Sequence, residues 1–175
     1  MREPSLRDLD LKEVYDSEQH DLVRDLLVPL LQHSIEYKRG VGYFTSGWLS
    51  VAAEGLEDLA IRGGHAHYVV SPELSEEDWK AIVQGEEAKR DPTLWKIIED
   101  GVQSIAEALA LEKLKALSWL VMKNHLNFSL AFPREYKAAG MYHDKVGVCT
   151  DSHGNKIAFH GSFNDTKRGT LNGEA

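Results

Sequence analysis

Short apolar segments alternate along this chain with longer segments of helical periodicity, and this alternation restricts the fold more than any other feature. Val41–Phe44 and His65–Ser71 have the length and composition of buried strands. Between them, Gly47–Ile61 repeats its apolar residues at helical spacing. An earlier helix is expected over residues 16–31, where Pro29 should kink or divide it. The N-terminal part of the chain therefore predicts strands packed against helices.

The second half of the chain adds more helices and then a hairpin. Residues 73–125 are mostly helical in pattern, and a change of phase near residues 110–113 predicts two helices or a bend. Asp151–Asn155 is rich in turn-forming residues and predicts a tight hairpin. Further strands are expected over Leu126–Phe132, Tyr142–Thr150 and Lys156–Phe159. The sequence therefore predicts an α/β fold with a mixed β-sheet flanked by helices on both faces.

The length and composition are those of one globular domain. The 175 residues, of which 42% are hydrophobic and 27% charged, suffice for one core, so residues 1–175 are expected to form a single domain. The sequence shows neither a membrane span nor the pattern of a secretory signal. Its single cysteine, Cys149, cannot form an internal disulfide. These features lead us to expect a cytoplasmic protein.

The formal net charge of −8 argues against a general nucleic-acid-binding surface, which is normally basic. The acidic excess is concentrated between residues 70 and 112, whereas residues 134–175 are close to neutral. A ligand that carries phosphate is therefore expected near the C-terminal part of the chain rather than near residues 70–112.

Two short polar motifs flank the predicted hairpin. His143 and Lys145 are two residues apart on one strand, and Ser162 and Asn164 repeat that spacing at the end of the other. Side chains two residues apart in a strand lie on the same face, and the hairpin brings the two pairs side by side. Lys145 and Asn164 can hold phosphodiester oxygens, and an imidazole can attack phosphorus or protonate a leaving alcohol. Because side chains supply the cations, no metal ion or cofactor is expected.

His-x-Lys, a hairpin and then Gly-Ser-x-Asn resemble the signature of the phospholipase D superfamily, carried here by His143–Val146 and Gly161–Asn164. The chain is similar to small bacterial endonucleases that carry one such motif. It also resembles the phospholipase D-like domains at the front of some superfamily 2 (DEAD/DEAH-type) helicases, and this likeness extends to Tyr37–Phe44 and Ser71–Asp78. The resemblance implies a phospholipase D-like fold and the N-terminal part of a longer helicase-type protein.

The resemblance also implies roles for individual residues. His143 would be the nucleophile that forms a phosphohistidine or, in a partner subunit, the acid that protonates the leaving group. Lys145 and Asn164 would hold the phosphate oxygens, and Ser162 would be a supporting donor. Glu174 would be the carboxylate that orients the histidine. One motif supplies one histidine while the mechanism needs two, so a homodimer that shares one active site is implied.

Two features depart from the family pattern. The acid of the motif normally follows the lysine after four residues, but Thr150 stands there and Asp151 comes one position later. Asp151 could belong to the hairpin turn instead, so it is assigned no catalytic role. The chain also stops at Ala175, where the family usually continues with another strand. It is therefore either an N-terminal fragment or a short protein.

The function expected is that of a metal-independent phosphodiesterase that cleaves DNA through a phosphohistidine. The alternative is a non-catalytic nucleic-acid-binding or regulatory module of a helicase or of a restriction or defence protein, and lipid hydrolysis is less favoured. His65 and His67 share a strand face, but without a matching His or Cys pair they do not predict a zinc site. Cys149 is expected to be a small buried hydrophobic residue.

Overall fold

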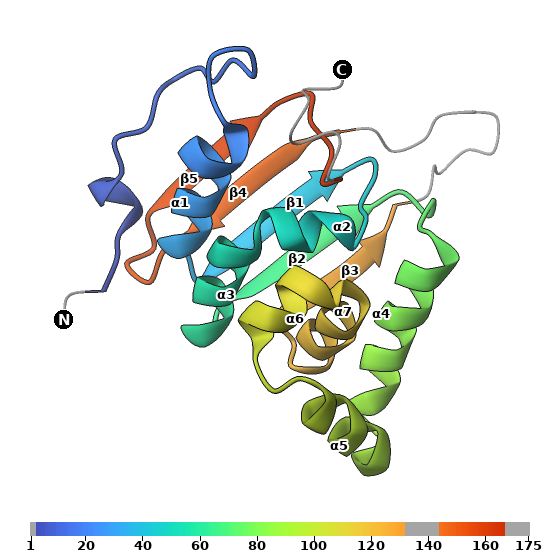
Figure 1. Cartoon of the computed structure of the whole chain (residues 1–175). Coiled ribbons are helices and arrows are strands. Elements are labelled where there is room, and N and C mark those ends of the chain that lie inside the picture. Colours follow the sequence, from blue (N-terminus) through green and yellow to red (C-terminus); the bar gives the residue numbers. More distant parts are fainter. Residues whose placement is uncertain (1–2, 132–143, 167–175) are drawn as a thin grey trace.

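The computed structural model describes residues 3–131 and 144–166, and within these ranges five strands form one sheet in the order β3-β2-β1-β4-β5 (Figure 1). The strands are β1 (Glu36–Val41), β2 (His65–Val70), β3 (Leu126–Leu130), β4 (Val146–Thr150) and β5 (Lys156–His160). β1, β2 and β3 run parallel, while β4 is antiparallel to both β1 and β5. The α/β class and the mixed sheet predicted from the sequence are confirmed.

Helices connect the parallel strands. α2 (Gly47–Val51) and α3 (Ala53–Ile61) lie between β1 and β2, so the single helix predicted there is divided at Ala52. The connection from β2 to β3 holds α4 (Glu76–Ala88), α5 (Pro92–Gly101), α6 (Ile105–Leu111) and α7 (Lys113–Met122). The change of phase predicted near residues 110–113 is the break between α6 and α7.

The chain before β1 lies near β4 and β5 and ends in a helix that packs against α3 (Figure 1). It contains the 3-10 turn η1 (Leu6–Asp8), the π-helical turn η2 (Val23–Leu27) and α1 (Val28–Gln32). Pro29 stands in the first turn of α1, directly after the π-helical turn, where the backbone hydrogen-bond pattern changes. The predicted helix over residues 16–31 is therefore shorter than expected and divided near this proline.

The helices that the structure describes lie on one face of the sheet (Figure 1). Tyr37, Tyr68 and Leu126 point to that face and are fully buried. On the opposite face, Lys38 and Ser129 are exposed. Helices therefore flank one face of the described sheet, where the sequence analysis predicted helices on both. The alternation of polar and apolar residues in His65–Val70 is typical of such a half-buried sheet.

The first strand begins and ends earlier than predicted, at Glu36 and Val41 rather than over Val41–Phe44. The strand is hard to recognise in the sequence, because two adjacent basic residues, Lys38 and Arg39, are unusual in a central strand. In the structure Lys38 points to the open face and Arg39 is buried. Val41 remains in the strand, and Phe44 lies beyond it.

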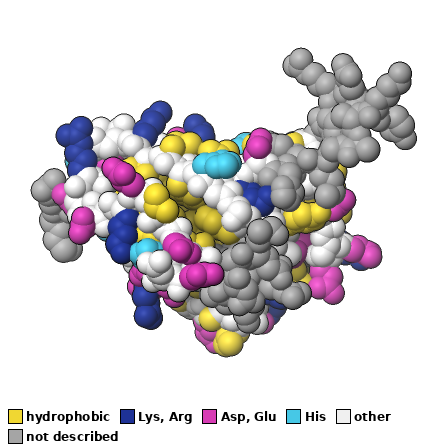
Figure 2. All heavy atoms as spheres, turned by 90° about the horizontal axis from the view of Figure 1, so that it is seen from above, with side chains coloured by type: hydrophobic (Ala, Val, Ile, Leu, Met, Phe, Trp, Pro, Cys, Tyr) yellow, Lys and Arg dark blue, Asp and Glu magenta, His cyan; other side chains and the backbone are white. Residues whose placement is uncertain are grey.

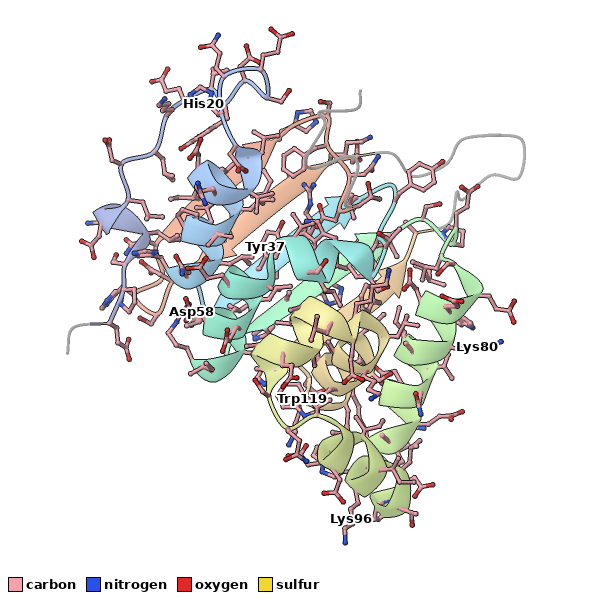
Figure 3. All side chains as sticks on the ribbon, in the orientation of Figure 1. His20, Tyr37, Asp58, Lys80, Lys96 and Trp119 are labelled. Carbon is pink, nitrogen blue, oxygen red and sulfur yellow. The ribbon has the colours of Figure 1, made fainter. Side chains whose placement is uncertain are left out.

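An aromatic cluster fills the core between the sheet and the helices. Tyr68 is its centre, with the rings of Tyr37, Phe44 and Trp48 at centroid distances of 6.0, 5.2 and 5.9 Å. Figure 3 shows Tyr37 behind the helices, in the middle of the sheet. Phe44 belongs to this core, because its side chain is 2% exposed.

Candidate functional site

The chain segments that carry the predicted site meet at one edge of the sheet. We call this the carboxyl edge, because β1, β2 and β3 all end there; β4 begins there and β5 ends there. The order of the strands also reverses here, since the chain passes from β1 to β2 on one side and returns to pair β4 on the other. In open α/β sheets, such a reversal point is where ligands bind.

Lys145 lies at the carboxyl edge directly before β4. Its carbonyl oxygen accepts a hydrogen bond from the backbone N–H of Gly161 at 3.1 Å, so the two predicted motifs are adjacent. The Lys145 side chain is buried, and burial lowers the pKa of its ammonium group. The positive charge of Arg39 lowers that pKa further, while Asp144 acts in the opposite direction. The ammonium is therefore held in a partly desolvated place next to a second cation.

Ser162 and Asn164 follow the end of β5 rather than standing within it. The predicted alternation is present, because Ser162 is exposed and Asn164 half-buried while Phe163 and Asp165 point inward. The Asn164 side-chain oxygen accepts a hydrogen bond from the backbone N–H of Tyr43 at 3.2 Å. The carboxamide is thereby oriented by the chain that leaves β1, and its amino group is the atom that can donate to an anion.

Two predicted site residues cannot be placed. His143 and Glu174 lie outside the described residues. The structure thus brings the chain segments of Lys145, Ser162 and Asn164 to one edge, with the Lys145 side chain buried and that of Ser162 exposed. The predicted nucleophile and its orienting carboxylate remain predictions.

A buried ion pair that the sequence analysis missed lies directly beneath these groups. Arg39 Nε donates to Asp165 Oδ1 at 2.9 Å, and Arg39 Nη2 donates to the carbonyl of Phe163, also at 2.9 Å. Both side chains have no exposed surface. Burial by itself lowers the pKa of Arg39, but the charge of Asp165 outweighs this and raises it above its ordinary value. Arg39 therefore keeps its charge, and the only signal in the sequence was a basic pair inside an apolar segment.

Asp151 lies at the other end of the hairpin, far along β4 from Lys145. Its carboxylate accepts hydrogen bonds from Ser5 Oγ, the Leu6 N–H, the His153 N–H and the N–H and Nδ2 of Asn155, at 2.8 to 3.0 Å. Burial raises the pKa of Asp151, but these hydrogen bonds outweigh burial and lower it well below its ordinary value. Asp151 therefore holds the hairpin turn and the N-terminal segment, as its place in the predicted turn suggested.

A cavity of about 700 Å³ adjoins Ser162. Its walls come from the N-terminal segment, η2 and β5, and include Leu11, Tyr15 and Phe159, with His160 and Ser162 at the carboxyl edge. Figure 2 looks onto this end of the molecule and shows hydrophobic side chains lining a hollow. An organic group attached to a phosphate at this edge would find apolar surface beside it.

The remaining residues singled out in the sequence have structural surroundings. Cys149 is fully buried, as predicted, and burial raises the pKa of its thiol to about 12. His67 hydrogen-bonds Ser129 at 3.0 Å on the open face, and His65 lies 3.7 Å from the Glu36 carboxylate. Among residues 3–131 and 144–166, no cluster of three or more His, Cys, Asp or Glu side chains is arranged to hold a metal ion.

No helix in the described part of the chain is long and apolar enough to cross a membrane. No known family model matches the sequence, and no curated protein matches it closely enough to count as a relative.

Proposed function

We propose that this protein is a phosphodiesterase of the phospholipase D type that acts on DNA. The observation that carries the proposal is the junction of the two motifs, where the Gly161 N–H bonds the Lys145 carbonyl at 3.1 Å. The junction supports the proposal because the segments that carry an ammonium group, a hydroxyl group and an oriented carboxamide are adjacent near the reversal point of the sheet. Such a set of donors suits a phosphodiester, whose oxygens gain negative charge in the transition state.

In the proposed reaction, an imidazole nitrogen of His143 attacks phosphorus. A P–N bond forms while the P–O bond to the leaving alcohol breaks, and the imidazolium of His143 in a second copy gives that alcohol its proton. Water then attacks phosphorus, the P–N bond breaks, and the second imidazole takes the proton of the water. Both histidines return to their starting states, so no other reactant is consumed. Lys145 and Asn164 hold the oxygens throughout.

The reaction requires two copies of the chain, because each carries one His143. A closed two-fold dimer is the simplest way to bring two identical histidines to one phosphate. Size-exclusion chromatography with light scattering should give twice the 19.6 kDa mass of the chain. A monomer at assay concentrations would contradict the shared site.

Nicking of supercoiled plasmid in excess EDTA tests the activity. We expect cleavage by the natural sequence and none by His143→Ala. His153→Ala is the matched control, because His153 is an exposed histidine in the hairpin turn at the other end of β4; it should cleave normally. Failure of the natural sequence to cleave plasmid, single-stranded DNA and a small aryl phosphodiester would refute the proposal, as would equal cleavage by His143→Ala.

A second candidate is a DNA-binding module that does not cleave, positioned beside a helicase. It is favoured by one observation: the Asn164 carboxamide is oriented by the Tyr43 N–H at 3.2 Å, and a donor fixed in this way would bind a phosphate oxygen whether or not the ester is then cleaved. Electrophoretic mobility shifts at constant salt distinguish the two. A module that only binds should lose DNA in Lys145→Ala, keep it in His143→Ala and cleave in neither case.

A further inference from the structure

We propose that the buried Arg39–Asp165 ion pair is the positioning element of the candidate phosphate site and holds Asn164 in place. The inference rests on the proposed function for what the site binds. The two residues of the ion pair contact no phosphate themselves. They position the side chains that would bind it.

Arg39 hydrogen-bonds to both residues that flank Asn164 in the chain. The guanidinium of Arg39 bonds the carbonyl of Phe163 at 2.9 Å and the carboxylate of Asp165 at 2.8 to 2.9 Å. Asn164 stands between these two contacts, so its backbone cannot shift unless the ion pair opens. A planar guanidinium is the side chain that can make both contacts at once.

The chain that leaves β1 holds the same segment from a second direction. The Thr45 N–H donates to the carbonyl of Asp165 at 3.1 Å, and Phe44 forms a bridge with Asp165. The Tyr43 N–H fixes the side-chain oxygen of Asn164. Residues of β1 and residues just after it therefore both contact the segment Phe163–Asp165. Arg39 is the contact that comes from within the strand.

Two aromatic rings pack against the guanidinium group of Arg39. Its central carbon lies 4.7 Å from the centre of the Phe163 ring and 5.4 Å from that of Phe159, and the two rings are nearly parallel. Gly147 lies between Arg39 and Phe159 in register, and a Cβ there would overlap the Phe159 ring. The glycine thus leaves space for the ring that covers the guanidinium.

This pair is not built for stability alone. Arg39 Nη1 and Asp165 Oδ2 are both buried and make no hydrogen bond of normal geometry with the described residues, although the Tyr68 hydroxyl interacts with the Asp165 carboxylate. An apolar pair of similar volume would avoid that cost, and buried ion pairs are often replaceable in this way without loss of stability. A buried pair with two unsatisfied atoms directly beneath a candidate site is expected where orientation matters more than stability.

Arg39 also lies near the other proposed phosphate ligand. It is opposite Gly147 in register, and Lys145 comes two residues before Gly147, on the same face of the sheet. Burial and the charge of Arg39 lower the pKa of the Lys145 ammonium, while Asp144 acts in the opposite direction. Arg39 is therefore close to Lys145 and bonded to both neighbours of Asn164, so we expect both ligands to change together when the pair is altered.

Asp165→Asn tests the proposal, because it keeps an acceptor for Arg39 and removes only the charge. The first measurement is the pair of Asn164 side-chain amide signals in ¹⁵N NMR, assigned with Asn164→Asp, before and after inorganic phosphate is added. We expect these signals to shift and broaden in Asp165→Asn and phosphate binding to weaken. The second is hydrolysis of bis(p-nitrophenyl) phosphate, where kcat should fall about 10²-fold with a smaller change in KM.

Three further variants complete the test. Arg39→Lys keeps the charge but not the double contact, so it should behave like Asp165→Asn. Arg39→Met with Asp165→Leu removes both charges together, and it should fold while showing the same loss at Asn164. Arg62→Gln is the matched control, because Arg62 also bonds two carbonyls, those of Leu31 and Ser34, away from the carboxyl edge; it should leave the Asn164 signals unchanged.

The outcomes separate the two proposals. If the natural sequence cleaves but folded Asp165→Asn and the double variant retain kcat and the Asn164 signals, the positioning role is refuted and the proposed function stands. If the natural sequence cleaves nothing, the proposed function fails, and the Asn164 signals in the absence of ligand still decide the positioning role. Changed signals support that role, and unchanged signals overturn it.

Discussion

Replacing Asp151 by alanine should destabilise the fold by about 3 kcal/mol. The carboxylate accepts two buried donors from the N-terminal segment, Ser5 Oγ and the Leu6 N–H, and three partly buried donors from the hairpin turn. Water can reach the turn donors in the variant, but it cannot easily reach the two buried ones. Each buried donor left without a partner costs about 1 to 3 kcal/mol, and the pair should therefore cost about 3 kcal/mol.

Urea unfolding followed by circular dichroism measures this loss. The hydrogen bonds hold the pKa of Asp151 below its unfolded value of 3.8, so the folded carboxylate stays charged when the unfolded one is protonated. Its contribution is therefore complete at pH 7 and declines as the pH falls below about 4. The free-energy difference between the natural sequence and Asp151→Ala should be largest at pH 7 and smaller at pH 3.

Asp91→Ala is the matched control. Asp91 caps α5 through exposed hydrogen bonds to the N–H groups of Thr93 and Leu94, so its loss should cost only about 1 kcal/mol. The reasoning is refuted if Asp151→Ala costs no more than Asp91→Ala. It is also refuted if the cost of Asp151→Ala is the same at pH 3 as at pH 7.

Two more predictions concern the interior of β4. Gly147→Ala should lower the free energy of unfolding by about 1 to 3 kcal/mol, because the added Cβ displaces Phe159; Gly101→Ala, which meets open space, is the control, and equal stability of the two variants would contradict the packing argument. Cys149, whose pKa is raised to about 12 by burial, should react with a disulfide reagent only after unfolding in urea. Rapid labelling of the native protein, followed by absorbance, would show that β4 opens readily.

Much of the fold could be predicted because its signals are local. The hairpin turn of Asp151–Asn155, the strand His65–Val70 and the break between α6 and α7 all depend on residues close to one another in sequence. Turn chemistry and hydrophobic periodicity act over the same short range, so they can be read directly. Which face of the sheet the helices cover could not be predicted in this way, because it depends on which elements pack against which.

The first strand and the centre of the site needed the structure. Arg39 looks like a surface residue in the sequence, and its partner Asp165 is 126 positions away. A charge can be buried in a strand only if the fold supplies a countercharge, and local pattern contains no record of such a partner.

The amino-acid order alone establishes the alternating strands and helices, the turn between the last two strands, and the spacing of Lys145, Ser162 and Asn164. The packing of distant segments establishes that β4 lies beside β1, so that these side chains gather where the strand order reverses. The difference has one physical cause. Backbone preferences act between near neighbours, whereas burial, charge pairing and strand order are settled only when the whole chain is compact.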